Sequence, residues 1–223
     1  MLVGTTGLIG MEMLQYLLAA KEYSKIISIT RQSSGIKHEK LEERIIDFDM
    51  LSRHDFSQFR INDVFCCLGT TIKKAKSKEA FIKVDLEYPL TIAKLAKEVN
   101  AEKFILVSSM GANARSKLFY SKVKGQLEEQ LQQLNFHSLI IFRPSLLLGK
   151  RAEFRPGETM AAVVAKGLFF LFIGHLKKYE PIAAKKVAQG MYKAAQLNNS
   201  ESIKIYESSD IVKIAKEAVI NNY

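Results

Sequence analysis

The residues best suited to chemistry are a tyrosine and a lysine four positions apart, Tyr120 and Lys124. On a helix, residues at this spacing share a face, so the Lys124 ammonium lies beside the phenol. A neighbouring positive charge favours phenolate, which lets Tyr120 exchange a proton with a carbonyl or hydroxyl oxygen. Lys122 is closer in the chain, but a residue two positions on points away from the tyrosine. Such pairs also occur by chance, so the prediction depends on what surrounds this one.

A serine pair precedes the expected helix. Ser108 and Ser109 end an apolar run that reads as a strand. In a parallel α/β sheet, the end of a strand lies at the carboxyl edge, where these sheets bind ligands. A serine hydroxyl there can hold the substrate oxygen.

A glycine-rich loop opens the chain, with Gly4, Gly7 and Gly10 spaced three apart between an apolar start and an amphipathic helix. Glycines let the backbone turn tightly and let a pyrophosphate approach, while the helix amino terminus supplies free N–H groups. A purely structural turn is the alternative, but the strand before and the helix after favour a dinucleotide site. Only three residues precede Gly4. We therefore expect a first strand that is unusually short or that begins upstream of Met1.

Arg31 follows the second expected strand. An acidic residue at this point binds the ribose 2′-hydroxyl of NAD, whereas an arginine suits the 2′-phosphate of NADP. Its guanidinium can also stack on the adenine. The alternative is a solvent-exposed arginine. Asp47 and Phe48 follow the third strand, where an adenine edge would lie, although an exposed loop aspartate is an equally simple interpretation.

Apolar runs alternate with amphipathic helical patterns along the first two thirds of the chain. The expected strands cover residues 25–30, 44–47, 63–68, 103–108 and 138–142. Such runs are typical of strands buried on both faces, as in a parallel sheet. Leucine-rich helical faces lie between them. We predict an α/β fold with a doubly wound parallel sheet of the Rossmann type.

The pattern changes after about Arg151. The expected elements there are helices at about 158–173 and 184–197, a short strand near 203–206 and a last helix from about 211. We predict one dinucleotide-binding domain over 1–223, in which residues 151–223 form a small substrate-side α/β cap. Arg155 to Glu158 begin either a lid or a plain helix. Arg143 either touches a substrate or fixes a loop.

Composition narrows the function classes. Of 223 residues, 48% are hydrophobic and 25% are charged, as in a globular protein with a sizeable core. The net charge of +10 allows anionic partners. The densest lysine run, residues 73–78, has no interleaved aromatics, so we expect a solvated loop and no nucleic-acid partner.

Cysteine and histidine usage excludes two further classes of site. The adjacent Cys66 and Cys67 cannot build a disulfide framework, and they read as packing residues with reduced thiols. The histidines have no neighbours at ligand spacing, so we expect no metal site. The apolar segment 160–176 is shorter than the roughly 20 residues of a membrane span. With no visible signal peptide, we expect a cytoplasmic protein without a membrane span.

Together these residues resemble the short-chain dehydrogenase/reductase superfamily, in its extended and atypical branches. A closer likeness covers nearly the whole chain, to the Tat-interacting-protein oxidoreductase family, an atypical reductase group that binds NADPH. The strings that carry this likeness are Phe65-Cys-Cys-Leu-Gly-Thr-Thr71, Val84-Asp85 with Tyr88, Ser108-Ser109-x-Gly111-Ala112, Tyr120-x-x-x-Lys-Gly125, Phe142-Arg-Pro144, Leu146-Leu-Leu148 and Arg155-Pro-Gly-Glu158.

The resemblance implies roles for residues at matching positions. Those that would line the pyrophosphate are Gly4, Thr6, Gly7, Leu8, Ile9 and Gly10. Those that would contact the rest of the cofactor are Arg31 at the 2′-phosphate, Leu68, Gly69 and Thr70 beside the adenine ribose and the phosphates, and Pro144 at the nicotinamide. Tyr120 and Lys124 would bind the nicotinamide ribose and serve catalysis. Ser109 would position the substrate, because the second serine of such a pair usually faces the site in similar enzymes.

We therefore predict an oxidoreductase that prefers NADP(H) over NAD(H) and acts on a small molecule, with Ser109, Tyr120 and Lys124 as the catalytic set. One alternative is an NADP(H)-binding regulatory or scaffold protein with a protein partner, which has no physical need for the tyrosine–lysine pair. A second is a nucleotide-sugar epimerase or dehydratase, for which about 70 residues after Arg151 leave little room.

Overall fold

The computed structural model describes residues 1–148, 180–197 and 201–217. Its main sheet has seven strands in the order β3-β2-β1-β4-β5-β6-β9, and every neighbouring pair is parallel. The strands are β1 (Leu2–Val3), β2 (Ile26–Thr30), β3 (Leu41–Ile45), β4 (Asp63–Cys66), β5 (Lys103–Val107), β6 (Ser138–Arg143) and β9 (Ile203–Glu207). The order reverses at β1, so the predicted doubly wound Rossmann-type sheet is confirmed.

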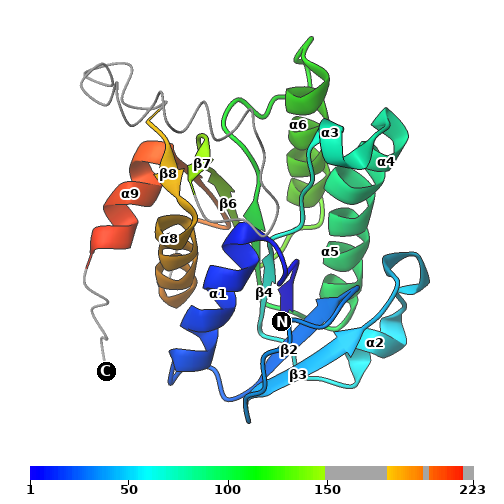
Figure 1. Ribbon diagram of the computed structural model, residues 1–223, viewed down its shortest axis with the longest axis vertical. Helices are drawn as coiled ribbons and strands as arrows, with labels where there is room; N and C mark the ends of the chain where they lie inside the picture. The colour runs from blue at the N-terminus through cyan, green and yellow to red at the C-terminus, as the bar shows by residue number, and fades with distance from the viewer. Residues whose placement is uncertain (149–179, 198–200, 218–223) are drawn as a thin grey trace.

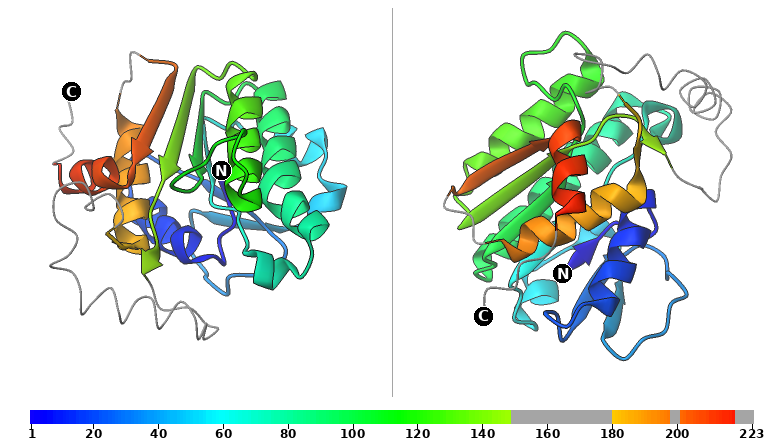
Figure 2. Two further views of the ribbon diagram at one scale, coloured as in Figure 1. Left: turned by 90° about the horizontal axis from the view of Figure 1, so that it is seen from above. Right: turned by 90° about the vertical axis from the view of Figure 1, so that its left-hand side faces the viewer.

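Helices cover both faces of this sheet (Figures 1 and 2). On one side lie α1 (Leu8–Ala19), α8 (Ala184–Gln196) and α9 (Ser208–Lys216), and on the other lie α5 (Tyr88–Glu98) and α6 (Phe119–Gln132). Shorter helices are α2 (Arg53–Ser57), α3 (Ile72–Ala75) and α4 (Lys78–Ile82), the turn Phe48–Met50 and a π-helical segment, Lys83–Glu87, which joins α4 to α5.

Two apolar cores lie on the two faces because successive strand residues point in opposite directions. Leu2 and Phe65 pack into the core with α1 and α8, while their neighbours Val3 and Cys66 pack into the core with α5 and α6. The central strands are buried on both faces, which explains why they read as continuous apolar runs.

The predicted boundaries of the third strand are wrong, and this strand is the edge strand β3. The sequence predicts a strand at 44–47, but β3 covers Leu41–Ile45 and pairs in register with β2. Its side chains are half-buried or exposed, so its Leu-Glu-Glu-Arg-Ile sequence lacks the apolar run that marks a central strand.

The carboxyl-terminal elements mostly follow the prediction. α8 and β9 lie at the expected places, whereas α9 begins at Ser208, three residues before the expected start at 211. β9 adds a strand to the main sheet beside β6, and α8 packs against α1. A second, two-stranded sheet joins β7 (Leu147–Leu148) to β8 (Ile182–Ala183). The predicted helix at 158–173 and the turn from Arg155 to Glu158 lie outside the described residues.

No helix within the described ranges combines the length and the apolar composition that crossing a membrane requires.

Candidate active site

The glycine loop runs from the end of β1 into α1, at the carboxyl edge of the sheet. Gly4 has φ +87°, and a Cβ built there would lie 2.7 Å from the Cys67 carbonyl carbon. A Cβ on Gly10 would lie 2.1 Å from the Gly4 carbonyl oxygen. Neither position admits a side chain, because real Cβ atoms do not approach so closely. The loop therefore brings the backbone of β1, the start of α1 and the segment after β4 into direct contact.

The amino terminus of α1 is open to an anion. Its N-cap residue, Gly7, provides no side-chain cap, and the first turn carries no acidic residue. The first N–H groups of a helix have no intrahelical partner and carry partial positive charge. Thr6 and Gly7 are exposed at this end, whereas Leu8 is half-buried. The Ile9 side chain is buried in the core, so only its backbone N–H could serve a ligand.

The loop after β4 lies across from the glycine loop. β1 pairs with β4 so that Val3 is opposite Cys66, which places Gly4 beside Cys67 and Leu68. Here the sheet order reverses, and a crevice outside the strand ends is where open α/β sheets take ligands. The structure thus brings Leu68 to the glycine loop, whereas Gly69 and Thr70, the next residues of the same loop, lie beside Asp85.

At the other end of the predicted dinucleotide site, Arg31 follows β2 and is exposed. Its guanidinium carbon lies 6.0 Å from the centroid of the Phe48 ring, which is itself buried. The Asp47 carboxylate accepts the Asp49 N–H at 3.1 Å and caps the turn Phe48–Met50. Asp47 therefore has a structural role in shaping the turn that presents Phe48.

The tyrosine and lysine that the sequence predicts as catalytic lie on the first two turns of α6. The Tyr120 ring packs against Phe81 of α4, with centroids 5.4 Å apart, and the side chain is half-buried. Lys124 is buried, and its ammonium lies 2.7 Å from Asp85 Oδ1. Burial alone would lower the pKa of Lys124, but the charges of Asp85 and Tyr120 outweigh it and raise that pKa.

Asp85 lies within the π-helical segment Lys83–Glu87 and is fully buried. Its Oδ2 atom accepts the Thr70 N–H at 2.8 Å. One carboxylate therefore holds both Lys124 and the loop after β4. π-helical turns occur frequently at functional sites.

The two serines after β5 differ in their contacts. Ser108 donates a hydrogen bond to Glu128 at 2.5 Å, and Glu128 also accepts hydrogen bonds from Arg143. The hydroxyl of Ser109 is buried and has no hydrogen-bond partner within the described residues. Since buried hydroxyls are normally satisfied, an unpartnered one at a strand end is suited to hold a ligand oxygen. This difference supports the choice of Ser109 over Ser108.

Arg143 fixes the structure around this site. Its guanidinium binds Glu128 at 2.5 Å and Glu207 of β9 at 2.9 Å. The hydrogen bonds to Glu128 raise its pKa above the usual value. The sequence leaves two roles open for Arg143, contact with a substrate or fixing a loop. These ion pairs favour the second role, because they hold neighbouring segments together. Pro144 follows and is buried, with its carbonyl accepting the Met110 N–H at 3.0 Å.

The cysteines are packing residues. Burial raises the pKa of the Cys66 thiol to about 11 and that of Cys67 well above its usual value. Neither thiol is suited to act as a thiolate nucleophile. Across the described part of the chain, no three histidine, cysteine or carboxylate side chains gather as metal ligands.

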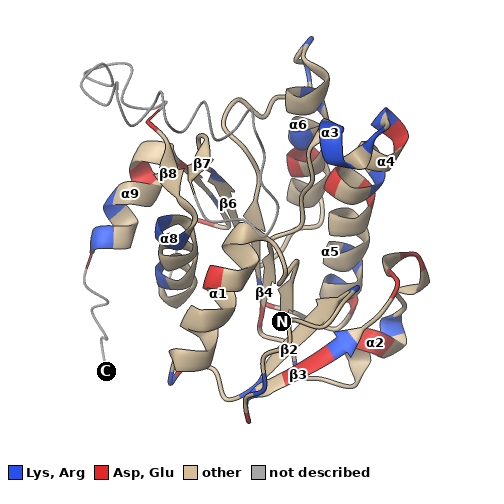
Figure 3. Cartoon of the chain, in the orientation of Figure 1, with Lys and Arg blue, Asp and Glu red and all other residues tan. Residues whose placement is uncertain are grey.

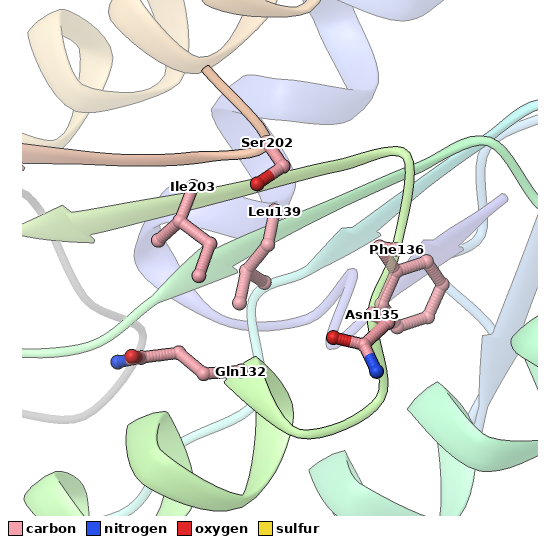
Figure 4. Close-up of a pocket in the computed structure, with 6 residues that line it drawn as sticks. All are labelled: Gln132, Asn135, Phe136, Leu139, Ser202 and Ile203. Carbon is pink, nitrogen blue, oxygen red and sulfur yellow. The ribbon is translucent and has the colours of Figure 1, made fainter.

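A separate cavity of about 110 Å³ lies at the opposite edge of the sheet (Figure 4). It is formed where α6 ends and where β6 and β9 begin, by Gln132, Asn135, Phe136, Leu139, Ser202 and Ile203. None of the predicted site residues lines it, and it contains no charged side chain, so it plays no part in the candidate site.

The residues that the sequence analysis missed are the partners of the buried charges. Asp85 was singled out only as part of the family resemblance, and Glu128 was not identified. The positions of two charged residues could have indicated these partners. Lys124 and Glu128 are four residues apart on a helix face that also carries Leu127 and Leu131. A charged pair within an apolar face indicates buried partners elsewhere in the fold.

Comparison with known proteins agrees with this geometry. The sequence profile of the NAD dependent epimerase/dehydratase family matches residues 1–207. Rat Protein HTATIP2 is 37% identical over 164 residues, which cover 72% of this chain and 67% of that protein. The mitochondrial Protein FMP52-1 of Scheffersomyces stipitis is 33% identical over 232 residues, covering 96% of this chain and 97% of its own. The resemblance to the Tat-interacting-protein family is confirmed.

Solved structures with the same fold are more distant in sequence. MoeE5 in complex with UDP-glucose and NAD has a TM-score of 0.68 at 11% identity, over 96% of this chain and 79% of that one. The UDP-glucuronic acid 4-epimerase of Bacillus cereus in complex with NAD has a TM-score of 0.68 at 13% identity, over 92% and 76%. At these identities the likeness concerns the fold.

The expected cytoplasmic location is wrong. The FMP52 relatives of Scheffersomyces stipitis, Meyerozyma guilliermondii, Eremothecium gossypii and Candida albicans are mitochondrial proteins by name. The expectation rested on reduced cysteines and on the opening residues, and reduced thiols do not distinguish one reducing compartment from another.

Proposed function

Because the chain belongs to the NAD dependent epimerase/dehydratase family, we propose that it is an NADP(H)-dependent oxidoreductase acting on a carbonyl or alcohol carbon. The observation that carries this proposal is that the Ser109 hydroxyl, unpartnered among the described residues, follows β5 at the same sheet edge where α6 begins with the Tyr120–Lys124 pair. Both lie on the elements that flank the loop after β4, beside the open amino terminus of α1.

The residues present fit a nicotinamide dinucleotide. Gly4 and Gly10 leave no room for side chains, and the first N–H groups of α1 are available to a pyrophosphate. Arg31 with Phe48 offers a cation and a ring where the adenosine end of such a cofactor would lie. Arg31 is the reason to prefer NADP(H), since its guanidinium can make charge-assisted hydrogen bonds to a 2′-phosphate.

The protein's own residues would act on the substrate oxygen. The bound nicotinamide supplies or accepts the hydride at the substrate carbon. For reduction, Ser109 donates a hydrogen bond to the carbonyl oxygen, and Tyr120 transfers its proton to that oxygen as it becomes an alcohol. The resulting phenolate is stabilised by the nearby Lys124 ammonium until a proton returns from solvent. Oxidation follows the same steps in reverse.

The first experiment is a calorimetric titration with NADPH and with NADH at moderate salt. Submicromolar NADPH binding with much weaker NADH binding would support the glycine-loop and Arg31 assignments together. A screen of carbonyl compounds for NADPH oxidation follows, with Tyr120→Phe as the control. Phenylalanine keeps the packing against Phe81 but has no proton to transfer, so we expect turnover to fall by about 10²–10⁴-fold with cofactor affinity retained.

Two results would count against the proposal. Turnover retained in Tyr120→Phe would remove that residue from the mechanism. Tight NADPH binding without turnover of any carbonyl or alcohol would favour the alternative of a regulatory protein that acts through a partner.

A nucleotide-sugar epimerase or dehydratase is the second candidate. The family match and the fold likeness to MoeE5 and the UDP-glucuronic acid 4-epimerase favour it. The same tyrosine, lysine and serine would serve that chemistry. Incubation of the protein with NAD and UDP-glucose or UDP-glucuronic acid, followed by anion-exchange separation of the sugar nucleotides, tests it directly.

A further inference from the structure

Two segments of the chain that adjoin Tyr120 are rich in cations: the segment that contains it, and the residues just before Phe81, whose ring contacts it. Residues 70–80 and 110–122 contain seven lysines and arginines and a single acid, Glu79, so they carry six of the ten net positive charges of the chain. We call six of these cations the basic rim: Lys73, Lys76, Lys78, Arg115, Lys117 and Lys122. All six are exposed. Figure 3 shows blue segments on α3, on α4 and at the tip of the loop that leads into α6, at the same end of the molecule, with one red segment on α4.

An aromatic cluster connects α4 to Tyr120 and to the start of α6. Phe81 of α4 lies 5.4 Å from the Tyr120 ring and 5.6 Å from the Phe119 ring, centroid to centroid. The Lys78 ammonium lies 5.4 Å from the centroid of Phe119. One cation of α4, Lys78, therefore packs against the start of α6, and Phe81 of the same helix contacts the ring of Tyr120.

The six cations of the rim form no ion pair with any residue in the described ranges. The next cation along the chain, Lys83, behaves differently and binds Asp49 at 2.7 Å. Inside the site, the charge of Lys124 is already balanced by Asp85. A negatively charged molecule that approaches Tyr120 would therefore be attracted mainly by the cations of the rim.

We propose that the basic rim selects the substrate, and that the substrate class is a carbonyl compound bearing a carboxylate or a phosphate group. This inference rests on the proposed function, because it describes the substrate of that same site. Clustered surface charges of one sign raise the local concentration of oppositely charged ligands and their association rates. The anionic group would sit among the exposed lysines, while the carbonyl reaches Ser109 and Tyr120.

The test compares matched acidic and neutral substrates. The probes are 4-formylbenzoate, its neutral methyl ester and 4-formylphenyl phosphate, each assayed by NADPH oxidation at low and at high salt. At low salt we expect kcat/KM for the two anions to exceed that of the ester by about 10-fold or more, and the preference to shrink at high salt as screening increases. Comparison of kcat/KM for 4-formylbenzoate and 4-formylphenyl phosphate shows which anionic group the rim favours.

Charge reversal on the rim is compared with the same reversal elsewhere. In Lys73→Glu/Lys117→Glu, we expect the preference for the anion over the ester to disappear. The control is Lys185→Glu/Lys186→Glu on α8, which is exposed and lies across the sheet from the rim (Figure 1). The control should keep the preference, because the net charge changes equally in both variants. An equal loss in both variants would overturn the proposal.

Three outcomes separate this inference from the proposed function. If the acid and the ester react equally at all salt concentrations, the rim does not select substrate, and the oxidoreductase assignment stands. If the rim variant weakens NADPH binding as much as it weakens anion turnover, the rim serves cofactor phosphates and the inference fails. If nothing is turned over, the same probes are titrated into the NADPH complex by ligand-observed NMR. If the anions bind in a salt-sensitive way and Lys73→Glu/Lys117→Glu abolishes that binding, the rim proposal holds although the proposed turnover fails. If no such binding occurs, the rim proposal is wrong.

Discussion

The buried ion pair beneath the site gives the sharpest stability prediction. Lys124 and Asp85 lie 2.7 Å apart with side-chain exposures of 4% and 0%. At an effective dielectric constant of about 20, their attraction is about 6 kcal/mol, most of which offsets the cost of removing both charges from water. Asp85→Asn keeps the shape and leaves an amide oxygen for the Thr70 N–H, but it leaves the Lys124 ammonium buried without a countercharge. We expect the free energy of unfolding to fall by about 3–5 kcal/mol.

The assay is urea and thermal unfolding of a matched set of variants. For a chain of this length the loss corresponds to a fall in Tm of roughly 6–20 °C. Lys124→Met alone should be similarly costly, since it leaves Asp85 unpaired, whereas Asp85→Asn/Lys124→Met should recover most of the stability. A single variant within about 1 kcal/mol of the wild type, or two single effects that simply add in the double variant, would refute the reasoning.

Three further predictions follow from the same contacts. Gly10→Ala places a methyl group 2.1 Å from the Gly4 carbonyl oxygen, so we expect lost dinucleotide binding by calorimetry together with a lower Tm. Arg31→Ala should weaken NADPH binding by about 10–100-fold, the worth of one charge-assisted contact, and leave NADH binding nearly unchanged in parallel titrations. The raised pKa of Lys124 stabilises the fold fully below its unfolded value near 10.4, and this contribution is lost as the pH rises through the folded pKa. Alkaline unfolding of the wild type should therefore be steeper than that of Asp85→Asn/Lys124→Met, and identical profiles would contradict this linkage.

The fold was predictable from the sequence where burial is complete. β4, β5 and β6 are buried on both faces, and each therefore reads as a continuous apolar run with clear ends. β3 was misplaced because an edge strand is half-exposed and its sequence mixes charges with apolar residues. The boundary of α9 was missed for a similar reason, since Ser208 and Asp210 open the helix before the first apolar residue.

Candidate site residues can be proposed from the sequence where they depend on local spacing. Gly4 to Gly10 and Tyr120 with Lys124 are each defined by short intervals within one turn or one helix, so the sequence alone indicates them as candidates. The partner of Lys124 depends on how the π-helical segment Lys83–Glu87 lies against α6, and no local pattern encodes that contact. Likewise, the spacing of Ser108 and Ser109 does not show which hydroxyl is already engaged by Glu128.

Helix α6 is positioned by two opposite buried charges on one face. Lys124 and Glu128 are four residues apart, a spacing at which such charges can pair on the helix. Instead each turns to another element, Lys124 to Asp85 and Glu128 to Arg143 of β6. Apolar packing tolerates small sliding of a helix, whereas ion pairs with defined geometry lose much of their energy when displaced. The two pairs therefore fix α6 along its axis between the segment after α4 and the end of β6. Tyr120, one turn before Lys124, and Ser109, next to the serine that Glu128 binds, are held in register by the same two contacts.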